Sequence, residues 1–133
     1  MDIDNLLRAK AAIYAGFTIL ADQVGVPLES VAKMLIGGSF GKYINVEKAM
    51  QIGLLPDMPW ECFEFLGNTA IRGTYYALLN RTSREHLADI ARRMTYIELS
   101  ADNTFYEAFL SAMFLPHTDM RRFPTVEAAI RKT

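Results

Sequence analysis

At 133 residues the chain is long enough for one domain with one core and too short for two complete domains. Its 14 Lys and Arg residues balance 15 Asp and Glu residues, which argues against a broad electrostatic attraction to nucleic acid or to a membrane surface. A single cysteine excludes a disulfide framework, a zinc knuckle and an iron–sulfur cluster held by this chain's own thiolates.

The chain also lacks the signals of a membrane or secreted protein. No apolar run approaches the roughly 20 residues of a membrane-spanning helix, and the acidic start Met1-Asp2-Ile3-Asp4 does not resemble a signal peptide. We therefore expect a cytoplasmic protein. Hydrophobic residues make up 51% of the chain, which indicates that some apolar surface faces a partner or a missing domain.

The first predicted element is a helix over 2–24, where apolar residues recur at helical spacing. Asp2 or Asp4 is placed to cap its start, and Gly25 to end it. After a short turn, a buried strand is predicted over 33–36, directly before paired glycines.

The middle of the chain predicts a second helix and a second strand. The helix begins near Asn45, a good N-cap residue, and ends at Gly53. A loop with two prolines leads to a strand over 62–66. The turn Gly67-Asn68-Thr69 then begins a helix that runs to about Leu79.

The next helix has Thr82 or Ser83 as its predicted cap and continues to about Arg93. A third strand is predicted over 95–99. The alternation of helices and strands predicts an α/β layer architecture.

A later helix is capped by Asp102 or Asn103, and Pro124 starts a short terminal helix. The core stripe of the later helix has three positions: Phe105, Phe109 and Met113.

Two strand-to-glycine turns, Ile36-Gly37-Gly38 and Leu66-Gly67-Asn68, suggest a nucleotide site. Ligands of open α/β sheets lie beyond the carboxyl ends of strands, and glycine lets a ligand approach the main chain closely. A tight turn without a ligand remains the alternative interpretation. Neither turn has a phosphate-binding G-x-x-x-x-G-K-[ST] or G-x-G-x-x-G pattern.

Five segments together resemble a known family. They are Arg8-Ala9-Lys10, Leu35-Ile36-Gly37-Gly38-Ser39-Phe40-Gly41, Ile52-Gly53-Leu54-Leu55-Pro56, Phe65-Leu66-Gly67-Asn68-Thr69 and Tyr96-Ile97-Glu98-Leu99-Ser100. The chain resembles, over nearly its whole length, the C-terminal part of ATP-dependent reductive activators of corrinoid proteins. This resemblance implies a domain of the sugar kinase, heat-shock ATPase and actin superfamily, whose ribonuclease-H-like halves clasp ATP. Residues 1–133 are then expected to form a single C-terminal half of an actin-like ATPase domain, with helices packed on a small sheet, in a longer iron–sulfur activator.

The resemblance also implies a function. Such activators take electrons through an iron–sulfur module and use ATP to drive reduction of Co(II) corrinoid to Co(I), which restores methyl-transfer proteins. The implied cofactors are ATP, with Mg in the complete domain, and an iron–sulfur cluster in the missing part of the parent. The implied partners are a corrinoid protein or corrinoid-dependent methyltransferase and the remaining half of the ATPase domain, with no nucleic acid and no membrane. This chain alone is not expected to hydrolyse ATP.

Site residues follow from the same resemblance. Lys10 matches the lysine that heat-shock ATPases set against the ribose, and a solvated lysine on an amphipathic helix is the alternative. Gly37, Gly38 and Ser39 match the turn that supports adenosine. Phe40 either flanks the adenine or shields the turn as a core aromatic residue.

The second turn adds Gly67 and Asn68, and Asn68 is equally suited to cap the following helix. His117 and Asp119 are too few to complete a metal site, so we interpret them as turn residues. Cys62 is interpreted as a packing residue.

Two other functions stay open. The chain can be an interaction module without nucleotide binding that docks a redox or methyltransferase partner through its apolar surface. An independent metal- or thiol-dependent enzyme has less support, because the sequence offers one cysteine and two scattered histidines.

Overall fold

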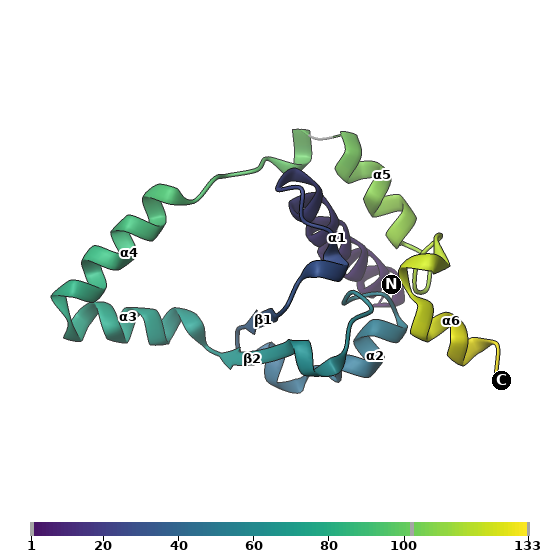
Figure 1. The fold of residues 1–133 in the computed structure, drawn as a ribbon, viewed down its shortest axis with the longest axis horizontal. Coiled ribbons are helices and arrows are strands. Elements are labelled where there is room, and N and C mark those ends of the chain that lie inside the picture. Colours follow the sequence, from purple (N-terminus) through teal and green to yellow (C-terminus); the bar gives the residue numbers. More distant parts are fainter. Residues whose placement is uncertain (1, 102, 133) are drawn as a thin grey trace. The chain divides into compact units, whose positions relative to one another are not determined.

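The computed structural model describes residues 2–101 and 103–132, and among these the side chains of Phe40, Lys42 and Ser100 are not described. The chain divides into two compact units (Figure 1). The first unit consists of Met1–Met34, Asn45–Phe63 and Leu99–Thr133, and the second of Leu35–Ile44 and Glu64–Glu98. The α/β fold with a small sheet is confirmed.

The first unit is helical. Its α-helices are α1 (Asp2–Gln23), α2 (Val46–Gln51), α5 (Asn103–Ala112) and α6 (Pro124–Ile130). Its 3-10 turns are η1 (Leu28–Ser30), η3 (Trp60–Cys62), η4 (Leu99–Ala101) and η5 (Met120–Arg122). Helices α1 and α5, far apart in the sequence, pack side by side (Figure 1).

The core of the first unit forms where α1 meets α5 and the start of α6. Its buried residues are Ala11, Tyr14, Ala112, Phe123 and Val126. The alanines allow the helices to approach closely, and the Phe123 and Tyr14 rings fill the adjoining space, 5.2 Å apart. Two residues of the predicted α5 stripe pack against this cluster: Phe109 and Met113.

Both predicted helix-ending glycines are confirmed. Gly25 has a φ of 65°, and Val26 N donates to Ala21 O at 2.9 Å while Gly25 N donates to Asp22 O at 3.1 Å. These two bonds make the Schellman motif, which requires the left-handed conformation that glycine adopts freely.

The same motif closes α2 at Gly53, whose φ is 75°. An added Cβ at Gly53 would lie 2.1 Å from Pro116 O, so this position also requires glycine for packing.

The second unit contains β1 (Met34–Gly37) and β2 (Phe63–Gly67) except for their first residues, the 3-10 turn η2 (Phe40–Tyr43), and helices α3 (Thr69–Leu79) and α4 (Arg81–Arg93). The two strands form a two-stranded sheet. Gly38 N donates to Gly67 O, so the carboxyl ends of both strands meet and the strands are parallel.

The sheet is less buried than predicted. The strand over 33–36 was expected to be buried, but its Leu35 is 57% exposed, and Phe65 of β2 is 41% exposed. A sheet of two strands leaves each strand with one unpaired edge, and such a small sheet cannot bury both faces.

The predicted third strand over 95–99 is wrong. Residues 94–98 have no regular secondary structure, and η4 begins at Leu99. The adjacent Tyr96 and Ile97 favour an extended chain, but a strand also needs a neighbouring strand for its backbone hydrogen bonds. Tyr96 is 81% exposed and donates its hydroxyl to Glu98.

The predicted cap of α4 is also wrong, because Asn80 caps the helix instead of Thr82 or Ser83. Asn80 Oδ1 accepts from Thr82 N at 2.8 Å. Asn80 has extended dihedral angles, which end α3 and start α4 at the same residue. Helix α5 begins at Asn103, and Asp102, its alternative cap, lies outside the described residues.

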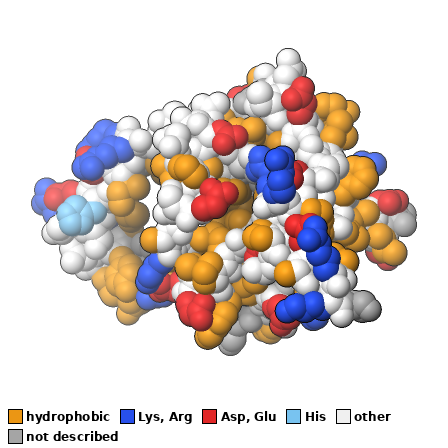
Figure 2. Space-filling model, turned by 45° about the vertical axis from the view of Figure 1, so that its right-hand side comes forward, with side chains coloured by type: hydrophobic (Ala, Val, Ile, Leu, Met, Phe, Trp, Pro, Cys, Tyr) orange, Lys and Arg blue, Asp and Glu red, His pale blue; other side chains and the backbone are white. Residues whose placement is uncertain are grey.

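Hydrophobic side chains reach the surface in several places between acidic and basic side chains on the face drawn in Figure 2. Over the described residues, the helices lack the combination of length and hydropathy that crossing a bilayer requires.

Candidate functional site

The two glycine turns lie together in the second unit. Gly38, which directly follows β1, donates its N–H to the carbonyl oxygen of Gly67, the last residue of β2, at 2.7 Å. Both glycines have left-handed backbone conformations, with φ values of 101° for Gly38 and 67° for Gly67. The turns therefore form a single pair at the carboxyl edge of the sheet, which is where α/β sheets bind ligands.

Gly38 and Gly67 leave open space where a side chain would be. An added Cβ at either position has no heavy atom within 4 Å. Both glycines are half-buried, and because they lack a side chain a ligand can approach their backbone more closely than that of any other residue type.

Gly37 has a different reason to be glycine. Its added Cβ would lie 2.9 Å from Thr69 Oγ1, so this position packs against the start of α3. Because Gly37 has no side chain, the end of β1 can lie close to Thr69 at the start of α3.

The polar side chains of the two turns differ in their hydrogen bonds. Ser39 is exposed at the start of η2, and its side chain makes no capping hydrogen bond. Asn68 Oδ1 accepts from Ile71 N at 3.1 Å, which confirms Asn68 as the cap of α3. The prediction for the Phe40 side chain lies outside the described part of the chain.

Arg72, which no sequence motif had indicated, also lies at this edge. Arg72 Nη1 lies 3.5 Å from Leu66 O, at the outer limit of a hydrogen bond. Its position four residues after the helix cap Asn68 was a signal, because that spacing returns a long side chain toward the start of the helix. Arg72 and the first N–H groups of α3 supply positive potential beside the glycine turns.

Lys10 belongs to the first unit and is buried there, with no exposed surface. Its Nζ donates to Pro116 O at 2.7 Å and also to Phe114 O. Burial lowers the pKa of Lys10 to about 8. The solvated-lysine alternative is therefore wrong, and a ribose contact by this ammonium, which stays a prediction, requires it to exchange these carbonyl partners.

His117 stabilises the segment whose carbonyl groups accept hydrogen bonds from Lys10. The His117 ring lies 5.4 Å from the Tyr14 ring and 6.2 Å from the Phe123 ring, and its Nδ1 accepts from Asp119 N at 2.9 Å. Since Nδ1 is an acceptor, the neutral ring carries its proton on Nε2. Burial lowers the pKa of His117, and the positive charges of Arg122 and Lys10 lower it further.

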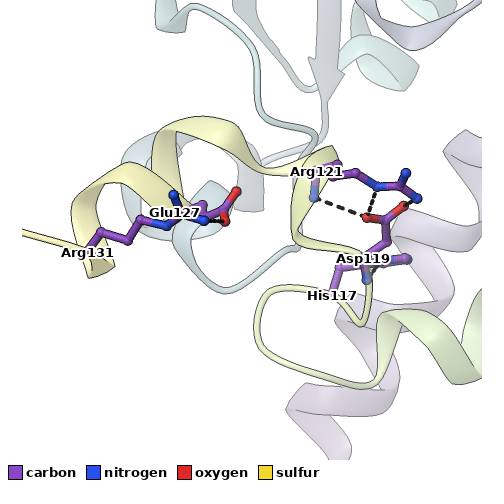
Figure 3. Close-up of polar contacts among 5 residues, drawn as sticks. All are labelled: His117, Asp119, Arg121, Glu127 and Arg131. Carbon is purple, nitrogen blue, oxygen red and sulfur yellow. Dashed lines mark hydrogen bonds and ion pairs between the residues drawn. The ribbon is translucent and has the colours of Figure 1, made fainter.

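Asp119 continues this turn with a bidentate pair to Arg121, drawn in Figure 3 together with Glu127 of α6 and Arg131, the C-cap of that helix. Arg121 Nε lies 2.8 Å from Asp119 Oδ1, and Arg121 Nη2 lies 2.9 Å from Oδ2. The guanidinium lowers the pKa of Asp119 to about 2. His117 and Asp119 thus form the hydrogen-bonded turn that the sequence indicated.

The donor set decides which groups fit this chain. Cys62 is half-buried, and one thiol cannot complete the four cysteine ligands of a typical iron–sulfur cluster. Over residues 2–101 and 103–132, His, Cys, Asp and Glu do not gather in groups of three that could hold a metal ion. At Gly38 and Gly67 the backbone has open space where a side chain would be, so a ligand could contact the main chain there.

Comparison with known families gives a match over almost the whole chain. The family described as "C-terminal domain of RACo the ASKHA domain" matches residues 1–127. A solved structure, "Reductive activator for corrinoid,iron-sulfur protein", is 48% identical with a TM-score of 0.86, and the match covers 93% of this chain and 20% of that chain.

Two curated relatives are also similar. "Corrinoid activation enzyme RamQ" of Eubacterium limosum is 35% identical over 109 residues, which cover 82% of this chain and 18% of the relative. The "[Co(II) methylated amine-specific corrinoid protein] reductase" of Methanosarcina barkeri is 23% identical over 111 residues, which cover 82% of this chain and 20% of the relative. The chain thus spans about a fifth of the length of these relatives.

Proposed function

Because the chain belongs to the family of RACo C-terminal ASKHA domains, we propose that it is the adenine-nucleotide-binding portion of an ATP-dependent activator. The activator drives reduction of a Co(II) corrinoid to Co(I) for methyl transfer. The names of the relatives support this proposal, since one is a corrinoid activation enzyme and another a reductase of a Co(II) corrinoid protein.

The single observation that carries the nucleotide part is the paired turn at Gly38 and Gly67. Both glycines have positive φ and open space beyond Cα, and they meet at the carboxyl ends of parallel strands. In the proposed site the nucleoside lies against this backbone, and the Ser39 hydroxyl donates to or accepts from the base. Gly37 supports the turn, and Asn68 holds α3 in place behind it.

The remaining half of the ATPase domain supplies the phosphate and Mg ligands, and an iron–sulfur module elsewhere in the parent supplies the electrons. The parent's partner is a corrinoid protein or a corrinoid-dependent methyltransferase. ATP promotes activation only through its different affinities for two conformations of the activator, because a ligand that binds both equally shifts neither.

Calorimetric titration of this chain with adenosine, ADP and ATP tests the nucleotide part. We expect comparable weak binding of all three, since this half holds the nucleoside and lacks most phosphate donors. Gly38→Val should abolish the heat of binding, because the new side chain occupies the space of the ligand. Gly25→Val is the matched control: Gly25 also has positive φ and open space beyond Cα, and it lies in the first unit.

The corrinoid part is tested in a full-length activator that contains this chain. Visible absorbance follows conversion of the Co(II) corrinoid to Co(I) with and without ATP. We expect Gly38→Val to remove the ATP-dependent reduction while Gly25→Val retains it. ATP-dependent reduction that is equal in both variants would contradict the assignment of this turn.

An interaction module is the second candidate, and exposed apolar residues of α3 favour it. Ile71 is 66% exposed, Tyr75 60% and Leu78 75%, and their spacing places them on one helix face. Calorimetry separates the two candidates. A folded chain that binds a methyltransferase or redox partner and gives no heat with any adenine nucleotide, even with the other half of the domain present, is an interaction module.

A further inference from the structure

An exposed groove in the first unit combines apolar side chains with negative charge. It has a volume of about 460 Å³. The residues that define this Trp60 groove are Glu47, Met50, Asp57, Met58, Trp60 and Pro124. They come from α2, the loop before η3, η3 itself and the start of α6, so segments distant in the sequence build the groove.

The apolar part of the groove is open to a partner. Trp60 is 70% exposed, whereas tryptophan side chains in folded proteins are mostly buried. Met58, by contrast, is only 9% exposed and anchors the loop beneath. An exposed tryptophan beside a partly exposed methionine such as Met50 is typical of protein-binding surfaces.

The walls of the groove are fixed before any partner binds. Thr125 N donates to Asp57 Oδ2 at 2.8 Å, and Thr125 Oγ1 donates to Asp57 Oδ1 at 2.6 Å. These bonds join the loop before η3 to the first turn of α6. Because the site is preformed, a partner does not have to order it.

The charge of the groove is negative and is not neutralised by its own residues. Asp57 receives its hydrogen bonds from neutral Thr125 groups, and Glu47 accepts from the neutral amide of Gln51 at 3.2 Å. Within the described ranges, the ion pairs do not involve Glu47 or Asp57. The groove lining itself includes no Lys or Arg.

Two nearby cations, Lys48 and Arg121, have other partners. Lys48 donates to Gln51 Oε1 at 3.1 Å, and Arg121, which lines the adjoining cavity, pairs with Asp119. The two carboxylates of the groove are therefore available to a cation from outside.

We infer that the Trp60 groove docks a polypeptide segment that carries Arg or Lys next to an apolar side chain. The apolar side chain contacts Met50 and Met58. The cation lies against the Trp60 ring, the aromatic side chain that attracts cations most strongly, and pairs with Glu47 or Asp57. Both the ring and the carboxylates select positive charge.

Fluorescence tests this inference directly, because Trp60 is the only tryptophan of the chain. The probes are three capped six-residue peptides in which leucine alternates with arginine, glutamine or glutamate. We expect the arginine peptide to change the Trp60 emission in a saturable way, the glutamine peptide to bind at least about tenfold more weakly, and the glutamate peptide not to bind. Equal affinity for the arginine and glutamine peptides would overturn the inference, since the groove would then accept any apolar segment.

Charge-reversal variants test the location. Glu47→Lys should weaken binding of the arginine peptide about tenfold or more, because the new charge repels the peptide at close range. Glu107→Lys, an exposed position on α5, makes the same change in net charge and should weaken it less than about twofold. Equal losses would show a general charge effect and reject the groove. Circular dichroism checks that both variants are folded.

Discussion

At the residue scale, Lys10 shows how packing overrides a surface pattern. Its position in the sequence suits a solvated helix face, yet its ammonium is enclosed and donates to the carbonyls of Phe114 and Pro116. A buried charge without a carboxylate partner is costly unless hydrogen bonds compensate. The two carbonyl bonds provide that compensation and attach the segment after α5 to α1.

We predict that the Lys10 ammonium makes stability depend on pH in the alkaline range. Its pKa is 10.5 in the unfolded chain and about 8 in the folded chain, so between these values the unfolded state binds more protons. The contribution of Lys10 to the free energy of unfolding should therefore rise as the pH increases from about 8 to 10.5. Urea denaturation of the wild type and Lys10→Met at several pH values measures the difference. Parallel pH dependences of the two proteins would contradict this assignment.

His117 predicts a pH dependence of the same sign in the acidic range. Burial and nearby cations lower its folded pKa, so as pH falls below 6.5 the unfolded chain takes up a proton that the folded chain resists. Stability should fall by at most about 1.4 kcal/mol per pH unit until the folded pKa is reached.

Urea denaturation at pH 7.5 and 5.5 checks this expectation. His117→Asn keeps an acceptor for Asp119 N and cannot be protonated, so it should lose less stability on acidification. His86→Asn is the control, because His86 is exposed on α4. If His117→Asn loses as much stability between pH 7.5 and 5.5 as the wild type does, the loss comes from groups other than His117.

At the element scale, short-range hydrogen bonds fix most helix ends. Asn45, Asn68 and Asn80 cap α2, α3 and α4 through their side-chain oxygens. Gly25 and Gly53 close α1 and α2 by the Schellman motif. The sequence predicted four of these five positions, because caps depend on residues within one turn.

Asn68 combines a demonstrated cap with a proposed ligand contact, and two variants separate these roles. Asn68→Ala should lower the stability of α3 by about 1 kcal/mol and Asn68→Ser should largely retain it. Calorimetry with adenosine then discriminates. Affinity that is lost in Asn68→Ala and regained in Asn68→Ser follows the helix cap, whereas a loss in both indicates a contact made by the amide itself.

At the scale of the whole molecule, burial is unevenly distributed. Helices α1 and α5 share the core of the first unit, whereas α3 and α4 have no buried residue. Seven residues of α3 and α4 are large, hydrophobic and exposed: Ile71, Tyr75, Tyr76, Leu78, Leu79, Leu87 and Ile90. The second unit therefore has little hydrophobic stabilisation of its own.

Hydrogen exchange should show this difference. We expect the amides of α3 and α4 to exchange faster than those in the middle of α1 and α5, because opening α3 or α4 exposes little additional apolar surface. Mass spectrometry of peptides from the four helices measures the rates, repeated at two protein concentrations. Equal protection of all four helices at low concentration would contradict the expectation, and protection of α3 and α4 that rises with concentration would indicate self-association.

The sequence by itself determined the helices, most of their ends, the two strands and the glycines that follow them, because these depend on periodicity and on bonds within a few residues. Only the tertiary structure decided that Lys10 is buried, that Gly38 meets Gly67 and that 95–99 has no partner strand. The Lys10 ammonium bonds to carbonyls more than 100 residues away in sequence. A local pattern carries no information about such a partner, since long-range contacts depend on how the elements pack.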